Sequence, residues 1–186
     1  PEYTDSVNCI GNLNDWGNNV HTGSHNLILG IGNSYTQHSS IVAGYLNAVN
    51  NEYASSIGGE KNIVTGLYAT ITGGGRNVAS GTSSSISGGY FNEASGQGSS
   101  ISGGYSTRAI GSYSSISGGR SNQAIGLHSS VSGGDFNTTN GDLSHISGGA
   151  RNVTNSGSLW STVSGGKLRS TSGFDDWVAG SLFEDD

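Results

Sequence analysis

The chain is poor in the residues on which most folded proteins depend. Its 186 residues include one proline, one cysteine and no methionine, and only 32% are hydrophobic and 11% charged. A lone cysteine, Cys9, excludes an intrachain disulfide. No apolar run approaches the roughly 20 residues that cross a membrane, so we expect no direct membrane insertion. Residues 1–5 do not resemble a signal peptide, which indicates a mature or excised segment.

The charge of the chain is acidic and small. Seven Lys and Arg stand against thirteen Asp and Glu, for a net charge of −6. Phosphate recognition needs clustered positive charge, so we expect no nucleic-acid partner. Disordered chains combine low hydrophobicity with high net charge, and this chain has only the first property. Its 33 glycines do not recur at every third position, which excludes a collagen helix.

What the chain has is a repeat with a period of 15 residues. The tetrapeptide Ile71-Thr72-Gly73-Gly74 returns at this step until Ile146, and a last copy begins at Val163 after a step of 17. A fixed period of this size is typical of a solenoid, in which each repeat is one coil stacked on the previous coil.

The first half of each repeat predicts a strand. A small residue, an aliphatic residue and a glycine occupy alternate positions, so the three share one side of a strand with a period of two. The small column runs from Ala54 to Ser144, and the aliphatic column runs from Ile41 through Ser56 to Ile146.

The second half predicts a second strand. A column of Asn runs from Asn47 to Asn152, with Thr107 as the exception, and is followed at alternate positions by a small or aliphatic residue and a glycine. Tight glycine turns separate the two strands, because glycine adopts φ > 0 at little cost. We expect the inward Asn amides to bond to neighbouring backbone and to the next Asn rather than to hold a ligand.

Both ends depart from the repeat. We therefore divide the chain into irregular N-terminal coils and cap (1–40), regular coils (41–166) and a C-terminal cap (167–186). Solenoid ends need atypical caps, because an open last coil exposes unpaired strand edges. One Ile and one Ala per coil are little apolar burial for fifteen ordered residues, which predicts a homo-oligomer. The outward residues that suit a subunit seam are Ile63, Val78, Ile110, Ile125 and Val153.

The repeat resembles that of a known family. Residues 123–133 read Q-A-I-G-L-H-S-S-V-S-G, which is similar to the A-I-G-x-x-S-x-A-x-G repeat of YadA-like heads in trimeric autotransporter adhesins. The resemblance covers about residues 41–166. It implies an all-β, left-handed parallel β-roll assembled as a homotrimer, an extracellular location on a bacterial cell surface, and adhesion to host or prey surface proteins or glycans. It brings no catalytic residues to this chain.

Departures from the family pattern leave a related identity open. This chain has Ile or Val where the family often has Ala, and it doubles a glycine, as in Gly88-Gly89. It also lacks the neck, the coiled-coil stalk and the membrane-anchor strands of a full adhesin. A fibre tip or virion tip built from the same roll is therefore equally compatible.

The residues predict no enzyme, no cofactor and no metal site. Glycoside hydrolysis would need two carboxylates on one face, and the acids of the regular coils share no column in adjacent coils. No G-x-S-x-G elbow is present. His128 and His145 lie in neighbouring coils but lack a third metal ligand.

The variable turn positions are the predicted binding face. Exposed aromatic side chains give a large contact area at a small entropic cost. The candidate ligand-binding residues are Tyr90, Phe91, Tyr105, Tyr113, Arg120, His128 and Phe136. Three alternatives stay open: these aromatics cover turns or seal the seam, the uniform Ser rows form an ice-binding face, or the chain is a purely structural fibre segment. Ice-binding faces favour Thr over Ser, because the Thr methyl group restricts the rotamer.

Overall fold

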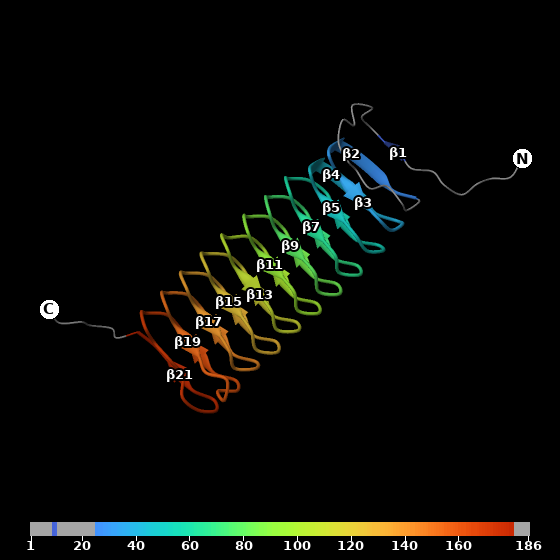
Figure 1. Ribbon diagram of the computed structural model, residues 1–186. Coiled ribbons are helices and arrows are strands. Elements are labelled where there is room, and N and C mark those ends of the chain that lie inside the picture. Colours follow the sequence, from blue (N-terminus) through green and yellow to red (C-terminus); the bar gives the residue numbers. More distant parts are fainter. Residues whose placement is uncertain (1–8, 11–24, 181–186) are drawn as a thin grey trace, which may run out of the picture.

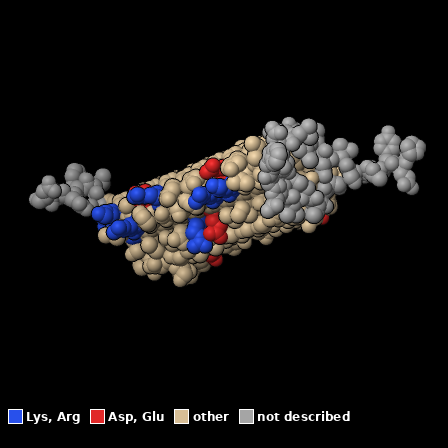
Figure 2. Space-filling model, turned by 45° about the horizontal axis from the view of Figure 1, so that its top comes forward, with Lys and Arg blue, Asp and Glu red and all other residues tan. Residues whose placement is uncertain are grey.

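The computed structural model describes residues 9–10 and 25–180, which form a parallel β-solenoid. Coils of about 15 residues stack along one axis, and most coils contribute one strand to each of two facing sheets (Figure 1). The described residues contain no helix, and none therefore forms a helix long and apolar enough to span a membrane. The space-filling view shows a straight rod whose surface is mostly uncharged (Figure 2).

Within the described residues, one sheet has 12 strands and the other has nine, and all the pairs are parallel. The larger sheet, sheet A, contains β1 (Cys9–Ile10), β2 (Leu27–Ile31), β4 (Ile41–Tyr45), β6 (Ser55–Ser56), β8 (Thr70–Ile71), β10 (Ser85–Ile86), β12 (Ser100–Ile101), β14 (Ser115–Ile116), β16 (Ser130–Val131), β18 (His145–Ile146), β20 (Thr162–Val163) and β21 (Trp177–Val178). The smaller sheet, sheet B, contains β3 (Ser34–Tyr35), β5 (Ala48–Val49), β7 (Ile63–Val64), β9 (Val78–Ala79), β11 (Glu93–Ala94), β13 (Arg108–Ala109), β15 (Gln123–Ala124), β17 (Thr138–Thr139) and β19 (Val153–Thr154).

The core of the rod is two columns wide. Ile86 in β10 pairs with Ile101 in β12, and both are buried, while the paired Ser85 and Ser100 face outward. On the facing sheet, Ala94 of β11 is buried. The alternation of buried and outward positions confirms the predicted all-β solenoid with two short strands per coil.

The Asn column holds the turns and links successive coils. Asn77 Oδ1 accepts a hydrogen bond from the backbone N–H of Asn92 in the next coil, at 2.9 Å. Its Nδ2 donates to the carbonyl oxygen of Gly73 in its own coil (3.2 Å) and to that of Gly89 in the next (3.1 Å). These bonds confirm the structural role that the sequence predicts for the inward Asn residues.

Thr107 interrupts this Asn ladder. Its hydroxyl donates to Asn92 Oδ1 in the preceding coil at 2.9 Å. Thr107 has no amide group, so it cannot donate to the two glycine carbonyl groups that an Asn at this position would reach. The amide contacts resume at Asn122, whose Nδ2 donates to Gly118 and Gly134.

We predict that Asn77→Ala lowers the free energy of unfolding by about 2 kcal/mol, because a buried N–H and two carbonyl groups lose a partner. Chemical denaturation followed by circular dichroism measures the change. Asn140→Ala is the control, since Asn140 follows β17 and is partly exposed rather than buried, and its effect should stay within about 0.5 kcal/mol. Equal effects of the two substitutions would contradict the role of the ladder.

The two glycines of each double-glycine turn have different requirements. Gly89 has φ +87°, and a Cβ there would lie 2.3 Å from the Gly104 carbonyl oxygen and 2.4 Å from Asn92 Nδ2. A Cβ on the adjacent Gly88 would meet no atom within 4 Å. Only the second glycine is therefore required by the backbone angle and by the close approach of the next coil.

This difference predicts opposite outcomes for the same substitution at adjacent positions. Gly89→Ala should lower the free energy of unfolding by about 2 kcal/mol or more, through backbone strain and overlap with the next coil. Gly88→Ala should change it by no more than about 0.5 kcal/mol. Thermal melts of the two variants measure both effects, and equal melting temperatures would contradict this assignment.

The register changes in the coils that precede residue 55. Ile41 pairs with Ser55, and Val42 pairs with Ser56, so this step is 14 residues rather than 15. The predicted aliphatic column is therefore wrong at its first member: Val42 is buried, and Ile41 is 40% exposed. The cause is a single glycine, Gly44, at the turn where later coils have two. Parallel strand pairing nevertheless continues to β2, which pairs with β4, and to β3, which pairs with β5. Both strands lie inside the segment that the sequence assigned to irregular coils (1–40).

The last described coil closes differently. Arg169 takes the place of Asn, and its backbone N–H donates to Asn152 Oδ1 at 2.9 Å. In the small inward column, Asp176 follows Ser161, and its carboxylate accepts hydrogen bonds from the backbone N–H groups of Ser172 and Gly173, both at 2.7 Å. These bonds lower the pKa of Asp176. Charged side chains thus end two columns that are uncharged in the preceding coils.

Candidate functional site

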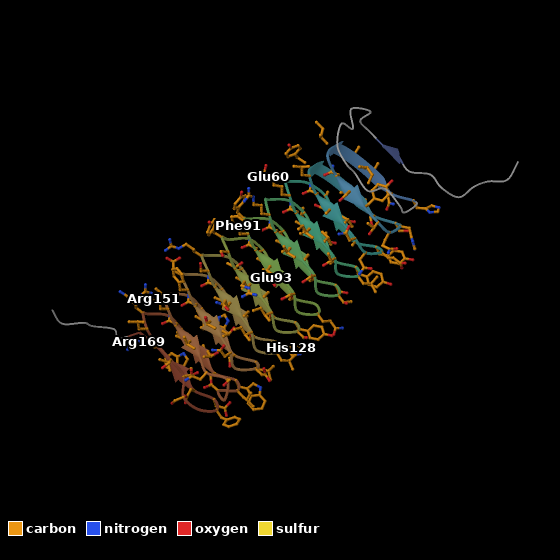
Figure 3. The ribbon with its side chains drawn as sticks, in the orientation of Figure 1. Glu60, Phe91, Glu93, His128, Arg151 and Arg169 are labelled. Carbon is orange, nitrogen blue, oxygen red and sulfur yellow. The ribbon has the colours of Figure 1, made fainter. Side chains whose placement is uncertain are left out.

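Each coil has two turns, and the turns stack into two opposite edges of the rod. The double-glycine edge consists of residues 58–61 and their equivalents in later coils, up to 165–168. The opposite edge consists of residues 66–68 and their equivalents. Figure 3 shows Glu60, Phe91 and Arg151 along the first edge and His128 along the other.

The predicted binding residues do not form one face. The structure places Tyr113 and His128 on the opposite edge, where their rings stack at a centroid distance of 5.0 Å. The double-glycine edge carries the other five: Tyr90, Phe91, Tyr105, Arg120 and Phe136.

Three of these residues form an aromatic cluster on the double-glycine edge. The centroids of Tyr90 and Phe91 are 4.6 Å apart, with the ring planes at 77°. Tyr105, one coil later, stacks on Tyr90 at 6.3 Å and lies edge-on to Phe91 at 6.1 Å. Arg76, from the preceding coil, covers the cluster, with its Cζ 5.3 Å from the Phe91 centroid and 5.9 Å from that of Tyr90. The surface thus presents three aromatic rings and a cation side by side.

A second group follows farther along the same edge. Arg120 Nη2 lies 2.8 Å from Asp135 Oδ2, and Arg120 Cζ lies 5.4 Å from the Phe136 centroid. Phe136 is 47% exposed. The ion pair is at the surface, where such pairs contribute little to stability.

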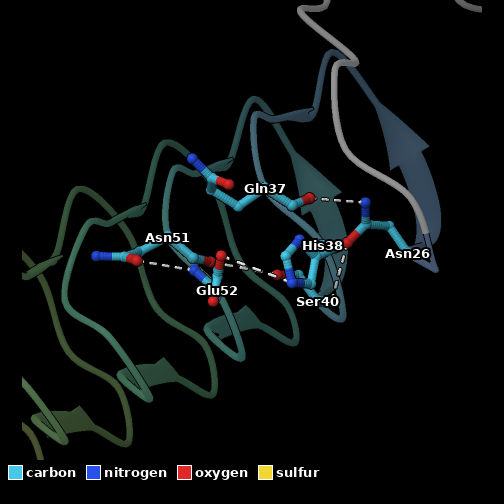
Figure 4. Close-up of polar contacts among 6 residues, drawn as sticks. All are labelled: Asn26, Gln37, His38, Ser40, Asn51 and Glu52. Carbon is cyan, nitrogen blue, oxygen red and sulfur yellow. Dashed lines mark hydrogen bonds and ion pairs between the residues drawn. The ribbon is translucent and has the colours of Figure 1, made fainter.

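The opposite edge carries aromatic pairs and acids. Tyr53 stacks on Tyr68 at 5.3 Å, and His38 lies edge-on to Tyr53 at 6.1 Å. Figure 4 shows the first coils of this edge, where His38 Nε2 lies 3.6 Å from Glu52 Oε1 and the backbone N–H of Glu52 donates to Asn51 Oδ1.

Both edges hold bulky residues at positive φ. Phe91 has φ 59° on the double-glycine edge, and Tyr113 has φ 57° on the other. The sequence assigned positive φ to glycine alone, whereas every described coil also places a residue other than glycine in this region. L-residues adopt it rarely, and here the repeated coil geometry imposes it. The side chains concerned project from the corners of the rod.

Sequence reasoning missed four basic residues of the double-glycine edge: Lys61, Arg76, Arg151 and Lys167. Arg76 and Arg151 share the column of Phe91 and Phe136, so extending the column of candidate residues would have found them. Lys61 lies one coil before Arg76 in that same column.

The outer face of sheet A is different in character. Among the described coils it carries no Asp, Glu, Lys or Arg at the outward strand positions, which hold Ser or Thr in most coils. His145 is the one titratable residue of the Ser rows, and it hydrogen-bonds to Ser130 (2.7 Å) and Ser147 (3.1 Å). Burial lowers the pKa of His145.

At its N-terminal end, the same face becomes apolar. Leu27 pairs with Ile41, Leu29 with Ala43 and Ile31 with Tyr45, all on adjacent strands. Five of these side chains are 36–48% exposed: Leu27, Leu29, Ile31, Ile41 and Tyr45. The predicted seam residues lie on the outer face of sheet B, where Val78 is followed in its column by the charged Glu93 and Arg108.

The described part of the chain has no pocket, and its His, Cys, Asp and Glu residues form no group of three that could hold a metal ion. Searches of protein families and of curated proteins find no match to this chain. The resemblance to YadA-like heads therefore rests on the repeat and on the coil geometry.

Proposed function

We propose that this chain is the non-catalytic adhesive head of an extracellular fibre, which binds protein or glycan on host or prey surfaces. It would be displayed on a bacterial cell surface or at the tip of a fibre or virion. The observation that carries this proposal is the cluster of Arg76, Tyr90, Phe91 and Tyr105 on an edge of the rod, whose described coils contain no pocket. Exposed Tyr and Arg are the residues that most often dominate protein interfaces.

The cluster is suited to binding because it needs no rearrangement. Its rings hold one another in place, and Phe91 and Tyr105 remain 42% and 51% exposed. A ligand therefore gains aromatic contact area while little side-chain entropy is lost.

We predict that the triple substitution Tyr90→Ala, Phe91→Ala and Tyr105→Ala weakens attachment to target cells by about tenfold or more, because aromatic contacts carry most of such binding energy. Flow cytometry with labelled protein measures attachment. The matched control removes three aromatic rings from the opposite edge, through Tyr53→Ala, Tyr68→Ala and Tyr113→Ala. Both variants should retain the β-sheet circular dichroism of the parent chain. Loss of attachment in the control alone would place the binding face on the opposite edge.

We further propose that three chains form a homotrimer of left-handed β-rolls, and that the outer face of sheet A lies between them. Interface cores are depleted of charged residues, and this face has none among its described outward strand positions. The exposed Leu and Ile side chains of β2 and β4 would lose contact with water there. The small Ser side chains would allow close packing in the remaining coils.

This interface predicts a solution mass of three 18.9 kDa chains. Leu29→Glu combined with Ile41→Glu should give monomers, because the charges would be buried without partners. Ile63→Glu combined with Ile125→Glu, on the outer face of sheet B, should leave the trimer intact. Light scattering coupled to size exclusion measures each mass. A monomeric parent chain would contradict the trimer, and the reverse pattern of dissociation would place the seam on sheet B.

Ice binding is the second candidate function, and the Ser rows of sheet A favour it. Ser85, Ser100, Ser115 and Ser130 are paired in register along the rod. Two observations oppose it. His145 interrupts the Ser rows and forms hydrogen bonds with the hydroxyl groups of Ser130 and Ser147. Ser also lacks the methyl group that restricts the side-chain rotamer of Thr. A monomer that shows thermal hysteresis would support ice binding. A trimer that attaches to no surface would instead support a purely structural fibre segment.

A further inference from the structure

The described coils are electrically neutral, but their charge is divided between the two edges. They contain all seven basic residues of the chain and seven of its thirteen acids. The double-glycine edge holds five bases and two acids: Lys61, Arg76, Arg120, Arg151 and Lys167, with Glu60 and Asp135. The opposite edge, in its described part, holds three acids and neither Lys nor Arg: Glu52, Asp142 and Asp175.

Four of the five basic side chains have no acidic partner among residues 25–180. Arg120 pairs with Asp135, but Lys61, Arg76, Arg151 and Lys167 make no ion pair within that range. These residues extend along about 34 Å of the rod, since each of the seven coil steps from Lys61 to Lys167 adds about 4.8 Å. An external anion can therefore bind them without displacing an internal one.

The shape of this edge selects an extended ligand. There is no pocket in the described coils to enclose a small molecule, and the bases follow the rod axis from Lys61 to Lys167. Five positive charges over about 34 Å are sparse beside one strand of duplex DNA, which carries one phosphate per about 3.4 Å of helix axis. A polymer with one charge per one or two sugar units is a closer match to this spacing.

The aromatic rings distinguish the same two polymers. Single-stranded nucleic acids bind aromatic side chains through stacked bases, which need a free ring face. Here Tyr90 and Tyr105 stack on each other, and Arg76 lies over Tyr90 and Phe91. The phenol groups are suited instead to hydrogen bonds with sugar hydroxyls. Guanidinium groups bind carboxylate or sulfate in a bidentate manner.

We propose that the ligand of the double-glycine edge is a linear acidic polysaccharide, carboxylated or sulfated, that lies along the rod. Lys61, Arg76, Arg151 and Lys167 bind its anionic groups, and Tyr90 and Tyr105 contact its sugars. This inference rests on the proposed adhesive function and names the chemical class of its ligand. The acidic opposite edge repels such a polymer and so orients the rod against it.

The test uses the full chain and four immobilised polymers: polygalacturonate, dextran sulfate, neutral dextran and a single-stranded DNA with the same number of charges. We expect binding to one or both acidic polysaccharides that weakens as salt is raised, and none to neutral dextran. Arg76→Gln combined with Arg151→Gln should weaken binding by about tenfold. Carboxylate and sulfate are distinguished by the two polysaccharide arms.

The control restores the net charge of this double variant on the opposite edge. Adding Glu52→Gln and Asp142→Asn returns the chain to its original charge, and binding should stay weak because the edge is still altered. Recovery of binding in this quadruple variant would overturn the proposal, as would tighter binding to DNA, equal binding to neutral dextran, or no binding to either acidic polysaccharide. Cell attachment that survives Arg76→Gln and Arg151→Gln would overturn the ligand class and leave the adhesive function standing. Polysaccharide binding that depends on this edge, without attachment to any cell, would overturn the adhesive function alone.

Discussion

In-register stacking of the coils through hydrogen bonds is the constraint on which the rest of the structure depends. Backbone groups pair across one coil, as in Ser85 N–H to the Ser99 carbonyl, and the Asn side chains add a second set of links between the same coils. The apolar core is too narrow to set the register alone, since it offers one Ile or Val opposite one small residue. Polar groups that bond to both the preceding and the following coil supply the register that the core cannot set alone.

Stacking also decides what the surface can present. A residue in one coil is the neighbour of the residue 15 positions later, so side chains meet in columns. Tyr53 stacks on Tyr68, Tyr113 stacks on His128, and Arg108 pairs with Glu93 for this single reason. The aromatic spacings of 5.0 and 5.3 Å follow from the spacing of parallel strands, which is about 4.8 Å.

One coil shape thus produces four surfaces with different properties. The outer face of sheet A is uncharged and ends in an apolar patch, whereas the outer face of sheet B is mixed. The double-glycine edge is basic and aromatic, and the opposite edge is acidic and aromatic. In the proposed trimer, sheet A would serve self-association, and the double-glycine edge, which is a different surface, would stay in contact with solvent for the proposed ligand.

The sequence alone determined the period, the two strands per coil and the inward columns, because a strand alternates its side chains and a repeat multiplies that signal. It also predicted the role of the inward Asn residues, since buried amides must find partners. It misplaced Ile41 because one glycine is missing at the turn that follows, which puts the positions before that turn one residue out of step with the 15-residue period. Only the tertiary structure showed that Gly89 is constrained and Gly88 is not, because that depends on the approach of the next coil. Only the tertiary structure separated Tyr113 and His128 from Tyr90 and gathered Lys61, Arg76 and Arg151 on one edge. Distances along a chain do not say on which side of a closed coil a residue emerges.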